Sequence, residues 1–166
     1  MANDDSALVP DQIITGELLY NEAINIILTS AQHKLVIFDQ NLSHGDFASA
    51  QKFEIFQQFL SKNPNSHLTI ILQDTAYFQE ECPRLLNLLT TYQHKMTVYE
   101  TNQSAKHAKD CFILTDDRHY IKRIHIDQAR FKYALNDVDN TALLNTRFKE
   151  LLEATQHVVG ISNLGL

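Results

Sequence analysis

The sequence has little glycine, proline or cysteine. Its 166 residues include four glycines, three prolines and two cysteines. So few glycines and prolines argue against long loops or internal repeats, and the glycines are isolated, which excludes a glycine-rich phosphate-binding loop. Cys82 and Cys111 are far apart and lack metal-ligand spacing. They predict two buried, reduced thiols.

Long apolar runs are also lacking. The longest, such as "LVIF" and "IIL", are far too short to span a bilayer. The first residues, "MANDDSALVPDQ", are acidic and have no apolar core of the kind that a signal peptide needs. We therefore expect no membrane association and a cytoplasmic location.

The charge of the chain is unevenly distributed. The net charge is −6, which disfavours a nucleic-acid partner or an anionic lipid surface. Residues 106–132, however, contain seven basic and four acidic side chains, a net +3, which leaves −9 for the remainder. The segment is either a solvated, lysine-rich hairpin or a local anion site.

Apolar periodicity predicts a three-layer α/β domain, a mixed β-sheet with helices on both faces. The early helix–strand alternation favours parallel strands with right-handed crossovers, and a later hairpin adds antiparallel strands. Expected strands lie near 33–39, 67–73, 96–100, 110–116, 119–125 and 130–135. Expected helices lie near 15–32, 47–63, 82–95 and 141–155.

Two of these helices have clear apolar stripes. In the first, Thr15 is the expected cap and the stripe is Leu18, Leu19, Ala23, Ile24, Ile27 and Leu28. In the last, the stripe is Leu144, Phe148, Leu151 and Leu152. With a composition of 44% hydrophobic residues and 20% charged residues, the chain is expected to form one soluble domain at 12–157, preceded by a tail at 1–11 and followed by an apolar tail at 158–166.

The stretch "SAKHAKDCFILTDDRHYIKR", residues 104–123, combines a His-x-Lys pair, a short apolar strand and two acids. With "TGELLYNEAINIILTSAQHKLVIFDQNL", "CPRLLNLLTTYQHKMTVYE" and the closing "FKELLEAT", it resembles one repeat of the phospholipase D superfamily, over roughly residues 12–157. More narrowly, it resembles an uncharacterised, degenerate bacterial branch of that superfamily. Active members carry His-x-Lys, four residues, then Asp, and after these a Gly-Ser-x-x-Asn element.

The resemblance implies a nucleophilic His, a Lys that stabilises the phosphoryl oxygens, and two motifs brought together by dimerisation of a single-repeat chain. If His107 and Lys109 occupy the motif, its Asp position falls on Leu114. If Asp116 occupies that position, Lys109 and Cys111 replace the His and the Lys. The Gly-Ser is replaced by "IKRIH", so we expect a non-catalytic domain that acts by self-association or by binding a protein partner.

Alternatives remain at this stage. A dimeric phosphodiesterase or nuclease would use His107 as nucleophile, Lys109 as phosphate ligand and Asp116 as the acid. A surviving phosphate or sulfate site would use Lys109 and Arg123, whose charges pair with phosphate. Short acid–imidazole groups give no third metal ligand, so no metal and no cofactor are expected. These groups are His44 with Asp46, Asp116 and Asp117 with His119, and His125 with Asp127.

Overall fold

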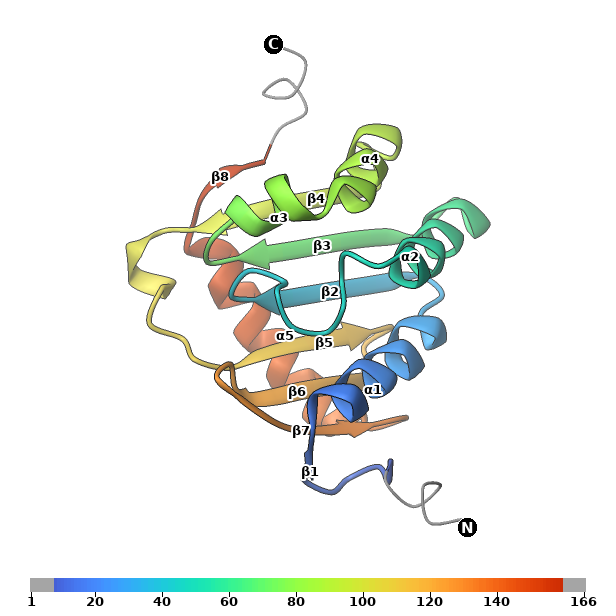
Figure 1. Cartoon of the computed structure of the whole chain (residues 1–166), viewed down its shortest axis with the longest axis vertical. Helices are drawn as coiled ribbons and strands as arrows, with labels where there is room; N and C mark the ends of the chain where they lie inside the picture. The colour runs from blue at the N-terminus through green and yellow to red at the C-terminus, as the bar shows by residue number, and fades with distance from the viewer. Residues whose placement is uncertain (1–7, 160–166) are drawn as a thin grey trace.

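An eight-stranded mixed sheet forms the centre of the molecule (Figure 1). The structure, a computed structural model, describes residues 8–159. The strand order is β1-β7-β6-β5-β2-β3-β4-β8. The pairs β2–β3 and β3–β4 are parallel, and all the remaining neighbouring pairs are antiparallel. The fold class expected from the sequence is confirmed.

The strands are β1 (Ile14–Thr15), β2 (Lys34–Asp39), β3 (His67–Leu72), β4 (Met96–Thr101), β5 (Cys111–Thr115), β6 (His119–His125), β7 (Gln128–Ala134) and β8 (Thr155–Val158). The helices are α1 (Glu17–Ser30), α2 (Ala50–Lys62), α3 (Ala76–Glu81), α4 (Pro83–Thr91) and α5 (Val138–Glu153), with a 3-10 turn, η2 (Gln103–Ala105).

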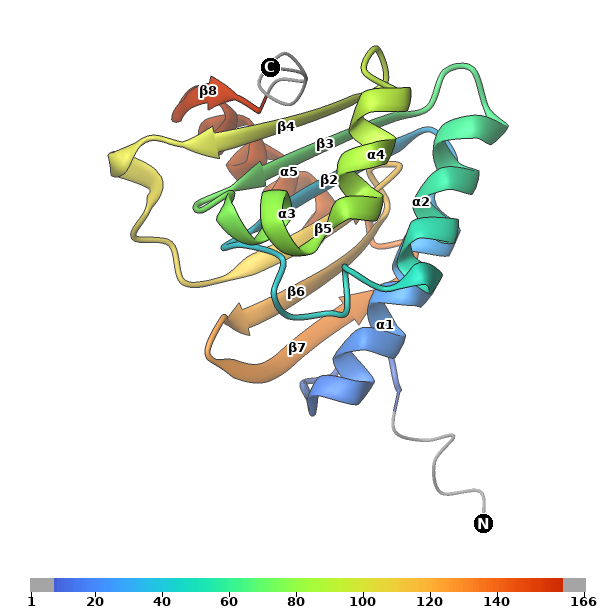
Figure 2. The same ribbon diagram turned by 45° about the horizontal axis from the view of Figure 1, so that its top comes forward.

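Helices cover both faces of the sheet, unequally. Helices α1 to α4 lie on one face and α5 crosses the other (Figure 2). Each face has its own apolar core. The larger core joins residues such as Ile24, Phe56 and Leu85 to the sheet, and the smaller one joins Leu144 and Phe148 of α5 to it. The single α5 cannot cover the whole of its face.

All six expected strands are present, with ends shifted by no more than two residues. The sequence did not indicate β1, β8 or α3. The expected C-terminal tail begins inside β8, where Val158 pairs with Tyr99, and Val159 is buried in the larger core. The rest of that tail, residues 160–166, lies outside the described residues.

Four expectations for the helices were wrong, and one concerns the last helix, where Leu152 is exposed instead of facing the core. Thr15 does not cap α1, because it is paired in β1 with Arg130 and the helix begins after Gly16. Leu18 is 79% exposed, and Tyr20 takes the inward place. The third helix ends at Thr91 and not near Lys95, because the chain turns before β4. The ammonium of Lys95 instead donates hydrogen bonds to the carbonyls of Leu60 and Asn63 at the end of α2.

Asp116 fastens the β5–β6 turn to the start of β2. Its carboxylate accepts hydrogen bonds from the backbone N–H groups of Gln32, His33 and Lys34, at 2.8 to 2.9 Å. Asp116 and Asp117 both have positive φ, 55° and 57°, as the tight hairpin turns that match sheet twist require. Asp116 is therefore a structural residue of the turn.

We expect Asp116→Gly to lower the free energy of unfolding by about 2–3 kcal/mol, because three backbone donors lose a charged acceptor while the positive φ stays easy to adopt. Asp117→Gly is the matched control. It removes only the exposed ion pair with Lys34 and a long hydrogen bond from Asn145, and it should cost less than about 1 kcal/mol. Urea unfolding midpoints measure both, and equal losses would contradict this role for Asp116.

Candidate functional site

The motif-like residues are separated along β5. His107 and Lys109 are exposed in the segment between η2 and β5, whereas Asp116 lies in the turn beyond the far end of that strand. At about 3.4 Å per residue, the strand places Lys109 and Asp116 on the order of 20 Å apart. The structure therefore does not bring His107, Lys109 and Asp116 together.

Arg123 lies inside the molecule, against helix α1. Only 1% of its surface is exposed. Its two terminal nitrogens each donate to one carboxylate oxygen of Glu17 at 2.9 Å, and its Nε donates to the carbonyl of His125. Its guanidinium also lies 4.8 Å from the ring centre of Tyr20. Arg123 is thus held by internal partners. Lys109 is exposed, so the two residues do not form the anion-binding site that was expected of them.

Further polar groups surround this ion pair. Cys111 is the cross-strand neighbour of Arg123, and its thiol lies 3.5 Å from the Tyr20 hydroxyl. Burial raises the pKa of both groups well above their ordinary values. The Cys111 thiol is therefore protonated at neutral pH and is a poor nucleophile. The cluster made by Glu17, Tyr20, Asp39, Cys111 and Arg123 is called the buried polar cluster below.

Asp39 ends β2 within this cluster. Burial raises its pKa to about 6, while hydrogen bonds from the backbone N–H groups of Gln40, Asn41 and Leu42 act in the opposite direction. A carboxyl group with such a perturbed pKa at the carboxyl end of a parallel strand is a typical feature of functional sites. Here it faces Arg123 and a protonated thiol, with no nucleophile beside it.

A shallow depression of about 570 Å³ lies outside the buried polar cluster. Its lining includes Glu17, Asn21, His44, Asp46 and Tyr77. His44 Nδ1 is 3.6 Å from a carboxylate oxygen of Glu17, so the imidazole of His44 contacts the cluster. The expected nucleophile, His107, is not among the lining residues.

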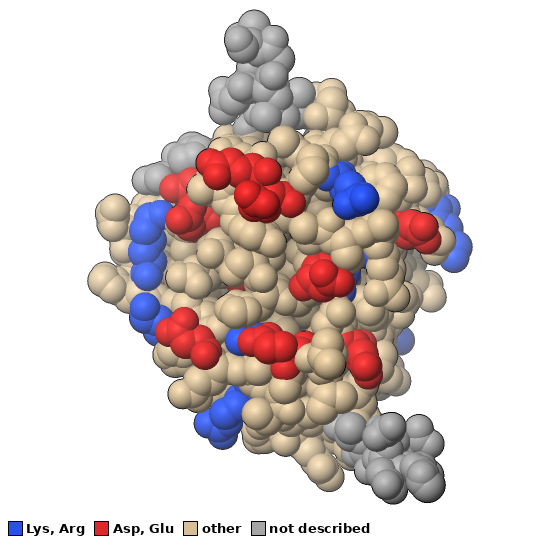
Figure 3. Space-filling model, viewed as in Figure 1, with Lys and Arg blue, Asp and Glu red and all other residues tan. Residues whose placement is uncertain are grey.

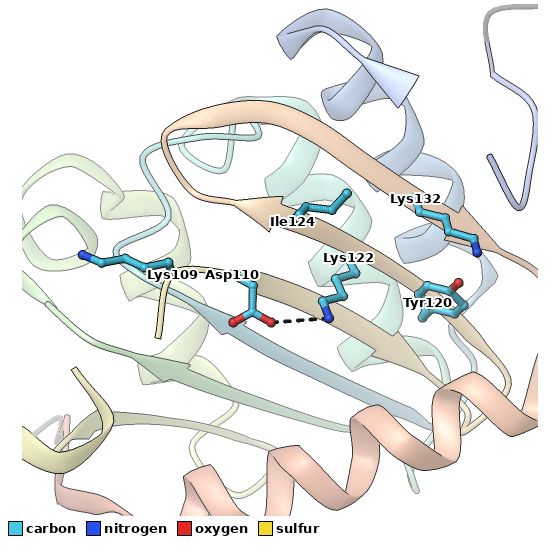
Figure 4. A pocket seen from close by; sticks show the side chains of 6 residues that line it. All are labelled: Lys109, Asp110, Tyr120, Lys122, Ile124 and Lys132. Atoms are coloured by element: carbon cyan, nitrogen blue, oxygen red, sulfur yellow. Dashed lines mark ion pairs between the residues drawn. The ribbon is translucent and has the colours of Figure 1, made fainter. Parts of the chain in front are cut away.

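A second hollow, of about 360 Å³, opens on the α5 side of the sheet. It is lined by Lys109, Asp110, Tyr120, Lys122, Ile124 and Lys132, and is called the lysine hollow below. Figure 4 shows Tyr120, Lys122 and Lys132 projecting from neighbouring strands into it, while the ammonium of Lys109 points outward from its rim. Alternation along β6 explains this, since Arg123 faces α1 and its neighbour Lys122 faces the opposite side.

Asp110 is the one acid in the lining of the lysine hollow. Its carboxylate lies 3.8 Å from the ammonium of Lys122 and also accepts a hydrogen bond from Arg147 of α5. On the opposite face, over α1 to α4, acidic side chains are spread widely and most basic ones lie near the margin (Figure 3). Three lysines and one acid thus line the lysine hollow, while another basic residue of the same segment, Arg123, is buried against α1.

The acid–imidazole pairs do not form a metal centre. Within residues 8–159, no three His, Cys, Asp or Glu side chains are grouped so that they could hold a metal ion. Over the same range, no helix has both the length and the apolar character needed to cross a membrane.

Sequence reasoning missed most of this arrangement. Lys122, Lys132 and Tyr120 follow strand alternation, so period-2 spacing could have placed them on one face. Nothing in the sequence indicated that Glu17 pairs with Arg123, because 106 positions separate them.

Comparisons with solved structures support the fold. The archaeal chromatin protein TrmBL2, described as showing a novel mode of DNA binding, matches with a TM-score of 0.63 and 11% identity over 87% of this chain and 53% of that one. NUC from Salmonella typhimurium, a phospholipase D family member, matches with a TM-score of 0.57 and 9% identity over 87% of this chain and 96% of that one. The chain thus spans about half of the chromatin protein.

At these identities the likeness shows the fold alone, and the expected phospholipase D-like fold is confirmed. In sequence, a family described as "Domain of unknown function (DUF7931)" matches residues 19–163. No curated protein matches the sequence.

We expect Glu17→Gln to lower the free energy of unfolding by about 2 kcal/mol, because it leaves the buried Arg123 guanidinium without its counter-charge, while the half-exposed position of Glu17 moderates the loss. The hydrogen bond from Arg123 lowers the pKa of Glu17 below its ordinary 4.5. The contribution is therefore complete above pH 4.5 and is lost as the pH falls through the folded-state pKa.

The matched control is Glu22→Gln, an exposed acid on the same helix, which should change stability by no more than about 0.5 kcal/mol. Urea unfolding at pH 7 and at pH 3 gives both values. A loss for Glu17→Gln that equals the control, or that persists unchanged at pH 3, would show that the ion pair is not a source of stability.

Proposed function

The chain belongs to this family of unknown function, DUF7931, and we propose that it is a phospholipase D-like domain that binds without hydrolysing phosphodiesters. The observation that carries the proposal is the Arg123–Glu17 ion pair beside a buried, protonated Cys111. In the register that uses Asp116, Cys111 takes the position of the phosphate-binding Lys. A thiol without charge at that position supplies no electrostatic stabilisation to a phosphoryl group.

The positions expected for the other catalytic groups support the same proposal. A nucleophile and its acid partner must lie within hydrogen-bonding reach of one another. His107 stands on an exposed segment, and Asp116 is occupied at the far end of β5 by three backbone donors. Neither residue can act on the other in this fold.

We expect no hydrolysis of bis-p-nitrophenyl phosphate above background, measured as release of p-nitrophenolate over hours at pH 6 to 8. The variants His107→Ala and His44→Ala are the controls, because His44 is the histidine in contact with Glu17. Turnover that His107→Ala abolishes would establish the enzyme alternative. Turnover that His44→Ala abolishes would place catalysis at the depression beside the buried polar cluster, and it would equally overturn the proposal.

The proposal includes association of the domain with a second copy of itself or with a protein partner. Its support is the resemblance to one repeat of a superfamily in which two repeats act together, and the 96% coverage of NUC, which makes the two chains similar in extent.

We expect the purified chain to form dimers at micromolar concentration. Multi-angle light scattering would then give twice the chain mass of 19.1 kDa. A mass of one chain up to about 100 µM, where even an association with a Kd of 1 µM would be nearly complete, would remove self-association from the proposal.

A further inference from the structure

We propose that the lysine hollow binds the phosphate group of a small phosphorylated organic molecule. This inference rests on the proposed function, since it names a ligand for a domain that binds without hydrolysis. It moves anion binding away from Arg123 to the opposite face of the same strand. Lys122 and Lys132 are the ligands; in Figure 4 the ammonium of Lys122 is directed to Asp110, and Lys132 extends on the side of Tyr120.

The two lysines oppose each other directly. Lys122 of β6 is the cross-strand partner of Lys132 of β7. Like charges in directly opposed positions destabilise a sheet, and here the carboxylate of Asp110, 3.8 Å from Lys122, offsets only part of that repulsion because Arg147 shares it. An anion seated between the two ammonium groups would convert the repulsion into two charge-assisted contacts.

Protection of a sheet edge does not explain the lysines. Exposed edge strands often carry lysine because it discourages pairing with other molecules. The outer edge of β7 is already paired with β1 through Ile14 and Phe131, and is further closed by hydrogen bonds from Asp11 and Gly16. Because β1 already pairs with this edge, a lysine on β7 is not needed to prevent pairing with another molecule.

The acidic side chains near the lysine hollow neutralise only part of its positive charge. The carboxylate of Asp110 is shared between Lys122 and Arg147. Among the described residues, Lys132 and Lys109 have no ion-pair partner within 4 Å, although Asp137, just before α5, lies near enough to Lys132 to interact with its charge. Arg130 follows on the face of β7 that carries Lys132, by strand alternation, and is exposed. The hollow therefore presents an excess of basic groups in a chain of net charge −6.

The shape and lining of the hollow decide the class of ligand. Its volume of about 360 Å³ is at the small end of the range for small-molecule sites. Ile124 and the ring of Tyr120 add apolar surface beside the ammonium groups, which suits an organic group attached to the phosphate. The acidic remainder of the chain opposes a long polyanion, so a phosphomonoester fits better than nucleic acid.

The experiment titrates the whole chain, ¹⁵N-labelled, with phenyl phosphate and with inorganic phosphate, at constant ionic strength set with sodium chloride. Amide shifts of β6 and β7 are followed by NMR. We expect saturable shifts around Lys122 and Lys132, tighter for phenyl phosphate than for inorganic phosphate. The double variant Lys122→Gln, Lys132→Gln should weaken the affinity at least about tenfold, because two charge-assisted contacts are lost.

A second double variant, Lys62→Gln with Arg118→Gln, removes the same number of charges from exposed positions elsewhere and should bind as the wild type does. Removing the opposed lysines relieves a repulsion and gives up one partly exposed ion pair, that of Lys122 with Asp110, so the hollow variant should be about as stable as wild type without ligand. Urea unfolding of the variant checks that loss of fold does not account for loss of binding.

Equal affinities in wild type and both variants, or shifts reproduced by chloride alone, would overturn the proposal. Tighter, steeply salt-dependent binding of a single-stranded oligonucleotide than of phenyl phosphate would overturn the assignment to a small ligand. Release of phenol from phenyl phosphate would show that the domain hydrolyses this ligand, and it would overturn the proposal that the hollow binds a phosphate group without reaction.

Discussion

The ion pair between Arg123 and Glu17 is the interaction on which the arrangement of this domain depends. It joins the first turn of α1 to the middle strand of the antiparallel half of the sheet, across 106 positions of sequence. A buried guanidinium is costly unless it is paired and hydrogen-bonded, and here Glu17, the carbonyl of His125 and the ring of Tyr20 are its partners. These contacts leave the side chain of Arg123 1% exposed.

Strand alternation makes this interior pair and the exposed lysines two results of one constraint. Because consecutive side chains of β6 face opposite sides, burying Arg123 against α1 turns Lys122 to the α5 side. Since α5 is a single helix, it covers only part of that side, and basic groups gather where it does not reach. The buried charge of Arg123 on the α1 face is therefore accompanied by the accessible charge of Lys122 on the α5 face.

The elements with clear periodicity could be predicted from the sequence, and those that depend on distant partners could not. Six strands and four helices follow from apolar spacing, whereas β1 has two residues and α3 six, too few to show a period. The register of the motif-like stretch fails in the sequence itself, and the absence of hydrolysis that it suggests stays a prediction. Arg123, expected to bind an anion, is buried instead. Strand alternation predicts that Arg123 and Lys122 face opposite sides of the sheet. It does not say which side packs against α1, so it could not predict which of the two residues is buried.

The first and last strands close the two ends of the sheet order, β1 beside β7 and β8 beside β4. A sheet edge without such a cover presents unpaired N–H and C=O groups to any neighbouring chain. The strands β1 and β8 occupy the hydrogen-bonding groups of the strands next to them, and Ile14 of β1 is also buried in the larger core. Removing β1 and β8 would thus expose the edges of β7 and β4, with their unpaired N–H and C=O groups. Such a shortened chain would form insoluble aggregates more readily than it would form a smaller monomer.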